Sequence, residues 1–143
     1  MKAKDIMTPS PVFCTQEAPL RDVARLMFEN DCGEIPVLDG SDRMKAVGVV
    51  TDRDITIRTV AAGRNPLEMK AGECMTSPAI TVDEDASLEQ CCSTLEKHQV
   101  RRILVVDDED RLCGVISQAD IAKYAPSELT GQVVKEVSQP TPT

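Results

Sequence analysis

Two short stretches of the sequence share one pattern: GVVTDRDI at residues 48–55 and GVISQADI at residues 114–121. Each places a hydroxyl residue three positions after a glycine and an aspartate three positions after that hydroxyl. The two apolar residues after each glycine suit a buried strand, and the hydroxyl residue that follows them suits the N-cap of a helix. The pattern therefore predicts a strand that runs into a helix, and its second copy indicates an internal repeat.

The rest of the chain repeats in the same register. When the first half of the chain is aligned on the second with one constant offset, matching residues pair over most of each half. The pairs are Met7 with Met75, Thr8 with Thr76, Leu20 with Leu88, Ile35 with Ile103, Val37 with Val105, Asp39 with Asp107 and Arg43 with Arg111. The second half is slightly shorter in a polar turn, after which Gly48 aligns with Gly114 and Asp54 with Asp120. Matches at corresponding places with one small gap indicate duplication.

Each copy predicts the element order β-α-β-β-α. The first has a short strand at 12–14, a helix with apolar residues at 20, 23, 24 and 27, a strand at 35–38, a strand ending at Thr51 and a helix from about Asp52. The second has a strand at 80–82, a helix opened by Ser87 as its N-cap, a strand at 103–106, a strand ending at Ser117 and a helix from about Gln118.

These elements predict an α/β (α+β) fold with one repeat at residues 3–63, a linker at 64–72, a second repeat at 73–125 and a C-terminal helix and frayed tail at 126–143. A unit of about 60 residues buries only roughly 60% of its surface and is marginal alone. We therefore expect the repeats to pack sheet to sheet with pseudo-two-fold symmetry. Such symmetry predicts two equivalent pockets, each assembled from both repeats.

Composition narrows the class of protein. Of the 143 residues 41% are apolar but only 2% are aromatic, so the core is expected to be aliphatic. The net charge of −8 opposes a nucleic-acid-binding surface, although a local arginine cluster can still bind a small anion. No apolar run approaches the ~20 residues of a membrane helix, and MKAKDIMTPSPV has no apolar signal segment. We expect a soluble, cytoplasmic protein.

The positions of the six cysteines in the sequence fit a role in core packing better than a role in disulfide, redox or metal chemistry. Each aligns with an apolar residue of the other copy or, for Cys113, stands like Val47 before the strand glycine. We predict small buried hydrophobes, with no disulfide framework and no metal site. The alternative is a thiol- or metal-responsive sensor, in which a partly exposed Cys14 or Cys32 reacts with oxidants or binds a metal with His98.

The repeated motif itself has two interpretations. A hydroxyl at a helix start can help to hold phosphate, and an ionised aspartate can accept two hydrogen bonds from a vicinal diol such as that of ribose. Alternatively, Thr51 and Ser117 are only helix N-caps, with Asp54 and Asp120 as favourable first-turn acids. An enzyme is not predicted, because the chain has one histidine, no phosphate-binding glycine fingerprint and no evident nucleophile–base pair.

With MTPSPV and MTSPAI, EIPVLD and VRRILVVD, these motifs resemble tandem CBS domains, named after cystathionine β-synthase. The resemblance extends from about residue 3 to residue 125 and is strongest to stand-alone bacterial pairs, including the hypoxic-response type. It implies a disc-like Bateman module: a non-enzymatic regulatory sensor of energy state that binds an adenosine ligand such as AMP, ADP or ATP and needs no cofactor. It also implies a homodimer and a regulated partner protein whose identity the sequence does not give.

The resemblance also assigns site residues. In the stronger site Ser117 and Asp120 would hold phosphate and ribose, Arg101 and Arg102 would supply positive charge, and Thr8, Val12 and the backbone near Glu34 would line the adenine. The mirror site would use Thr51, Asp54, Thr76 and Ile80. We expect this second site to be weaker, because Arg101 and Arg102 align with Gly33 and Glu34. A carboxylate there repels phosphate, whereas hydrogen bonds to charged groups contribute about 1.5–3 kcal/mol each.

Overall fold

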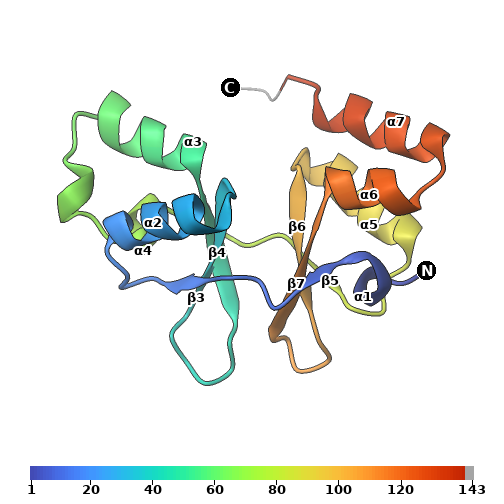
Figure 1. Ribbon diagram of the computed structural model, residues 1–143, viewed down its shortest axis with the longest axis horizontal. Helices are drawn as coiled ribbons and strands as arrows, with labels where there is room; N and C mark the ends of the chain where they lie inside the picture. The colour runs from blue at the N-terminus through green and yellow to red at the C-terminus, as the bar shows by residue number, and fades with distance from the viewer. Residues whose placement is uncertain (141–143) are drawn as a thin grey trace. The chain divides into compact units, whose positions relative to one another are not determined.

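The computed structural model describes residues 1–140, and the chain divides into two compact units. The central unit is Val12–Ala79, and the split unit joins Met1–Pro11 to the chain from Ile80 onward. Each unit combines one small sheet with helices, so the predicted α/β class is confirmed (Figure 1). The last residues of the predicted frayed tail, 141–143, lie outside the described residues.

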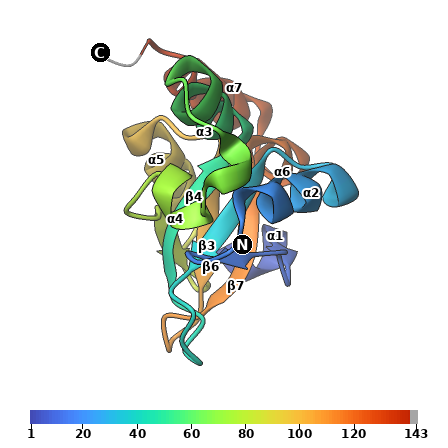
Figure 2. The ribbon, with the colours of Figure 1, turned by 90° about the vertical axis from the view of Figure 1, so that its left-hand side faces the viewer.

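The central unit is built on a sheet in the order β2-β3-β4. Strand β2 (Cys14–Thr15) runs parallel to β3 (Glu34–Leu38). Strand β3 pairs antiparallel with β4 (Ala46–Thr51), and both of these strands are labelled in Figure 2. Helix α2 (Leu20–Asn30) connects β2 to β3, and β4 leads into α3 (Asp52–Ile55) and a wider π-type helix, η1 (Thr56–Ala61). A short 3₁₀ helix, η2 (Pro66–Glu68), and α4 (Ala71–Cys74) complete the unit.

The split unit repeats this plan with additions at both ends of the chain. Its sheet has the order β1-β7-β6-β5, with β5 (Thr81–Asp83) parallel to β6 (Arg102–Val106) and β6 antiparallel to β7 (Leu112–Ser117). Helix α5 (Leu88–His98) connects β5 to β6, and α6 (Gln118–Tyr124) follows β7. Helix α1 (Ala3–Ile6) and strand β1 (Thr8–Pro9) precede them, and α7 (Ser127–Val137) packs on α5 and α6. The predicted N-cap of Ser87 and the C-terminal helix are confirmed.

The two sequence repeats exchange their first segments. Strand β1 pairs with β7, where Thr8 lies opposite Val115, so the start of the chain completes the unit that holds the second repeat. Conversely, Val49 of β4 forms a bridge with Thr76, and α4 supplies Ala71 and Cys74 to the central core. Residues 64–72, predicted as a linker, contain η2 and the buried Met69. The repeat in the sequence and the compact unit in space are therefore offset.

The motif glycine makes this exchange possible. A Cβ atom built on Gly48 lies 2.6 Å from the backbone oxygen of Thr76, and one on Gly114 meets the side chain of Met7. Neither position has room for a side chain while the exchanged segment lies against the strand. Gly48 therefore allows another backbone segment to approach closely, and Gly114 leaves room for the side chain of Met7.

The cores are aliphatic, as predicted. The largest fully buried side chains include Leu20 and Ile35 in the central unit and Leu95, Ile103 and Ile116 in the split unit. The aromatic residues lie at the surface instead: Phe13 and Tyr124 are each 42% exposed and Phe28 is 88% exposed. Strands β3 and β6 are buried almost throughout, whereas β4 and β7 alternate between buried and half-buried residues. The alternating strands are the ones that end in the two motif hydroxyls.

Candidate functional site

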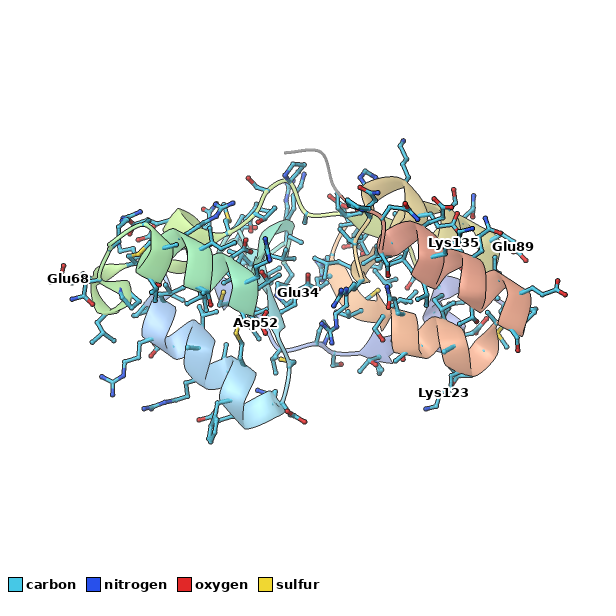
Figure 3. The ribbon with its side chains drawn as sticks, turned by 90° about the horizontal axis from the view of Figure 1, so that it is seen from above. Glu34, Asp52, Glu68, Glu89, Lys123 and Lys135 are labelled. Atoms are coloured by element: carbon cyan, nitrogen blue, oxygen red, sulfur yellow. The ribbon has the colours of Figure 1, made fainter. Side chains whose placement is uncertain are left out.

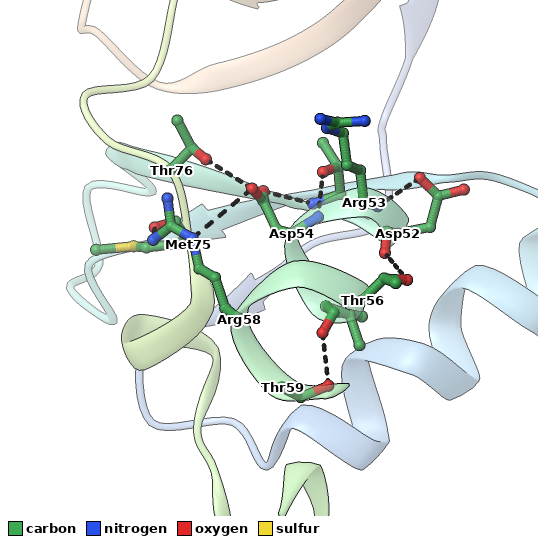
Figure 4. Close-up of polar contacts among 10 residues, drawn as sticks. Asp52, Arg53, Asp54, Thr56, Arg58, Thr59, Met75 and Thr76 are labelled. Atoms are coloured by element: carbon green, nitrogen blue, oxygen red, sulfur yellow. Dashed lines mark hydrogen bonds and ion pairs between the residues drawn. The ribbon is translucent and has the colours of Figure 1, made fainter. Parts of the chain in front are cut away.

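In the central unit the motif forms a capping box at the junction of β4 and α3. The backbone N–H of Asp54 donates to Oγ1 of Thr51 at 3.0 Å, and the backbone N–H of Thr51 donates to Oδ2 of Asp54 at 3.0 Å (Figure 4). Thr51 is the last residue of β4, and Asp54 lies in the first turn of α3, where its side chain can reach Thr51. Two backbone donors that the helix start would leave unpaired are satisfied reciprocally.

The split unit repeats this geometry at the junction of β7 and α6. The backbone N–H of Asp120 donates to Oγ of Ser117 at 3.2 Å, and the backbone N–H of Ser117 donates to Oδ2 of Asp120 at 2.9 Å. The interpretation of the hydroxyls as N-caps is therefore confirmed for both copies. Capping uses only the Oδ2 oxygen of each aspartate, so the difference between the two sites lies at Oδ1.

The Oδ1 oxygen of Asp54 is already bound inside the central unit. It accepts a hydrogen bond from Oγ1 of Thr76 at 2.9 Å and lies 3.9 Å from Nε of Arg58 (Figure 4). The same arginine donates from Nη1 to the backbone oxygen of Met75 at 2.8 Å. The Asp54 side chain is only 15% exposed. The predicted site residues Thr51, Asp54 and Thr76 are thus together, but they bind one another.

The Oδ1 oxygen of Asp120 has no such neighbours. Among residues 1–140 it accepts no hydrogen bond, and Asp120 forms no ion pair. Arg102 lies directly opposite Ser117 in the β6–β7 ladder, and the backbone oxygen of Arg101 accepts from the N–H of Gln118 at 3.0 Å. Both arginines are exposed and neither forms an ion pair within the described part of the chain. A half-buried carboxylate with a free oxygen therefore follows Ser117, whose neighbours across the ladder, Arg101 and Arg102, are exposed.

The central unit has the opposite charge at the corresponding place. Glu34 lies directly opposite Thr51 in the β3–β4 ladder, as Arg102 lies opposite Ser117. The backbone N–H of Asp52 donates to the backbone oxygen of Gly33 at 2.9 Å, which brings another carboxylate to the same end of the unit (Figure 3). The predicted charge difference between the two motif copies thus has a structural counterpart in the two ladders.

The predicted site residues divide between the units as follows. Thr8, Arg101, Arg102, Ser117 and Asp120 all belong to the split unit, where exposed Thr8 lies in β1 beside β7. Val12 and Glu34, predicted for the same site, belong to the central unit, and Ile80, predicted for the mirror site, belongs to the split unit. The contribution of these last three residues to a ligand site stays a prediction.

Comparison with known proteins decides the family. A profile of the CBS domain matches residues 3–58 and again residues 71–127. This chain belongs to the CBS domain family. Hypoxic response protein 1 of Mycobacterium tuberculosis is 37% identical over 138 residues, which cover 96% of this chain and 94% of that protein.

Solved CBS pairs have the same fold. A crystal structure of Hypoxic Response Protein I with two coordinated zinc ions has a TM-score of 0.78 at 35% identity and covers 88% of this chain and all (100%) of that one. The CBS domain pair of protein MJ0100, in complex with 5′-methylthioadenosine and S-adenosyl-L-methionine, has a TM-score of 0.72 at 25% identity and covers 86% of this chain and 94% of that one. No helix within residues 1–140 of this CBS pair is long and apolar enough to span a membrane.

Within residues 1–140 no three histidine, cysteine, aspartate or glutamate side chains group as metal ligands. Cys14, which we expected to be partly exposed if it reacts, is buried in β2 at 6% exposure, because β2 pairs with β3 over the core. The half-buried thiols are Cys32 and Cys113, and the second packs against the core of the split unit.

Sequence reasoning about this CBS pair missed Arg58. The signal was present, because Arg58 follows Asp54 by four residues and such a pair lies on one face of a helix. Its second contact, with the backbone of Met75, depends on the exchange of segments between the repeats. No local pattern in the sequence marks that exchange.

Proposed function

We propose that this CBS pair is a non-enzymatic regulatory module that binds an adenosine nucleotide (AMP, ADP or ATP) at the Ser117–Asp120 end of the split unit. The free Oδ1 oxygen of Asp120 carries the proposal. It is an acceptor with no partner among residues 1–140, and Arg102 lies opposite Ser117, the residue that caps the helix of Asp120. A carboxylate suits the two hydroxyl donors of a ribose, and guanidinium groups suit phosphate oxygens.

The relative MJ0100 supports the ligand class, because the two compounds in its CBS pair both contain an adenosine group. In the proposed mechanism the nucleotide favours one conformation of the module, and a partner protein detects that conformation. The shift is limited by the difference in nucleotide affinity between the two conformations. Thr8, exposed on β1, is the split-unit residue that we propose for the adenine side of the ligand.

Isothermal titration calorimetry of AMP, ADP and ATP on the full chain tests the proposal. We expect Asp120→Asn to weaken binding at least about tenfold, because hydrogen bonds to a charged group contribute about 1.5–3 kcal/mol. Asparagine keeps an acceptor for the N–H of Ser117, so the helix cap is preserved. Asp54→Asn is the matched control and is expected to change the affinity little. Equal losses in both variants, or no binding by the wild type, would contradict the proposal.

The phosphate part of the proposal has its own test. Arg102→Glu places at this position the residue that its repeat counterpart, Glu34, already has. We expect the loss of affinity to grow from AMP to ATP, because each further phosphate adds negative charge that the new carboxylate repels. Adenosine, which has the ribose but no phosphate, is the control ligand and should bind both proteins similarly. An equal loss for adenosine and ATP would show that Arg102 does not contact phosphate.

A further inference from the structure

The two motif copies differ at the position four residues after the aspartate. In the central unit this residue is Arg58, and in the split unit it is Tyr124. Arg58 makes two contacts at once, an ion pair with Asp54 at 3.9 Å and a hydrogen bond to the backbone oxygen of Met75 at 2.8 Å. The arginine is therefore fixed between α3 and the exchanged segment of the chain, with the motif aspartate beside it (Figure 4).

The split unit lacks each part of this arrangement. Tyr124 is 42% exposed and has no positive charge with which to pair Asp120. Thr8, the counterpart of Thr76, makes no hydrogen bond to Asp120 within residues 1–140, whereas Thr76 donates to Asp54 at 2.9 Å. The same motif is thus open at its Oδ1 oxygen in one unit and occupied in the other.

We infer that Arg58 is an internal competitor that keeps the Asp54 motif closed to ribose, so that the chain binds one nucleotide, at Asp120. This inference rests on the proposed function and assigns its specificity to one residue position. For a ribose to bind Asp54, its hydroxyls would have to replace both the hydroxyl of Thr76 and the guanidinium of Arg58 at a side chain that is only 15% exposed. The arginine is anchored to the backbone of Met75, which opposes its displacement.

The substitution Arg58→Tyr tests this assignment, because it gives the central unit the residue of the split unit. We expect calorimetry with adenosine to show one site per chain in the wild type and two in the variant. Adenosine is used because it has no phosphate for the carboxylate of Glu34, opposite Thr51, to repel. The double variant, Arg58→Tyr with Asp54→Asn, should return to one site. That result would identify Asp54 as the residue that binds at the second site. The affinity gained at the second site should be at least about tenfold, or about 1.4 kcal/mol.

Arg64→Tyr is the matched control. It removes an arginine of the same unit that is similarly exposed but pairs with Glu73 at 2.9 Å rather than with Asp54. We expect this variant to keep one site. The reciprocal substitution, Tyr124→Arg, keeps the inference testable if Arg58→Tyr does not fold. It should weaken the binding of adenosine at Asp120, and adenosine is used because it has no phosphate to attract the new arginine.

The outcomes separate the inference from the proposed function. Two equal sites in the wild type, a single site in a folded Arg58→Tyr variant, or unchanged adenosine binding by Tyr124→Arg would overturn the role of Arg58 alone. No binding by the wild type but binding by Arg58→Tyr would overturn the proposed function and support the role of Arg58. No binding by either protein would overturn both.

Discussion

At the scale of single residues, four of the six cysteines are poorly suited to thiol chemistry. Burial raises the pKa of Cys14, Cys91 and Cys92 to about 11. Burial also raises the pKa of Cys113 to about 11, and the nearby carboxylate of Glu84 adds to the effect. The thiolate is the reactive form of cysteine, and at pH 8 a thiol with a pKa near 11 is ionised in about one molecule in a thousand. For these four cysteines the structure therefore favours the packing role over thiol sensing.

Alkylation of the folded protein measures this difference. We expect iodoacetamide to label Cys113 slowly at pH 7 and about tenfold faster for each pH unit up to about pH 10, because the folded pKa lies above this range. Cys14, Cys91 and Cys92 should stay unlabelled until the chain unfolds, since they are also buried. Mass spectrometry locates the label, and protein unfolded in urea gives the reference rates. In Glu84→Gln the labelling of Cys113 should be faster, and a rate that does not depend on pH would contradict the raised pKa.

At the scale of the elements, local patterns in the sequence predict the helices and caps that depend on residues close together in the chain. The helices that begin at Leu20 and Leu88 and the N-cap of Ser87 follow from apolar spacing and from hydroxyl chemistry. Strand β1 and helices α1 and α4 were not predicted, because they are too short to show a period. They form because a distant strand or core receives them, and such pairing between distant segments leaves no local signal.

The exchanged segments make Gly48 a sensitive position. We expect Gly48→Ala to destabilise the protein by about 1–3 kcal/mol, because the new methyl group meets the backbone oxygen of Thr76, which the Val49–Thr76 bridge holds in place. Gly114→Ala should cost less, since the atoms in its way belong to the flexible side chain of Met7. The midpoints of urea unfolding compare the variants.

Gly131 provides the control for this comparison. It lies inside α7, and a Cβ atom there meets nothing within 4 Å. Gly131→Ala should therefore stabilise the helix by about 0.5–1 kcal/mol. If Gly48→Ala behaves like Gly131→Ala, the exchanged segment does not lie tightly against β4.

At the scale of the whole molecule, the ends of the described chain meet in one unit. The core of the split unit contains Ala3 and Ile6 from the first helix together with Val133 and Val137 from the last. The core of the central unit comes from one continuous segment and includes Cys74, the repeat counterpart of Ile6. A change near the N-terminus should therefore affect the unit that contains the second repeat, and a change at Cys74 the unit that contains the first.

Hydrogen exchange on two variants tests this crossed dependence. Ile6→Ala removes a side chain that is 3% exposed and should cost about 2–5 kcal/mol, as buried isoleucine-to-alanine changes do. We expect the amides of β6 and β7 to lose protection while those of β3 and β4 keep theirs, because no residue of the central core comes from the first eleven residues. Cys74→Ala should do the reverse, with a smaller loss in β3 and β4. Protection that fell in β3 and β4 of the Ile6→Ala variant but not in β6 and β7 would show that each repeat folds on its own first segment, without exchange.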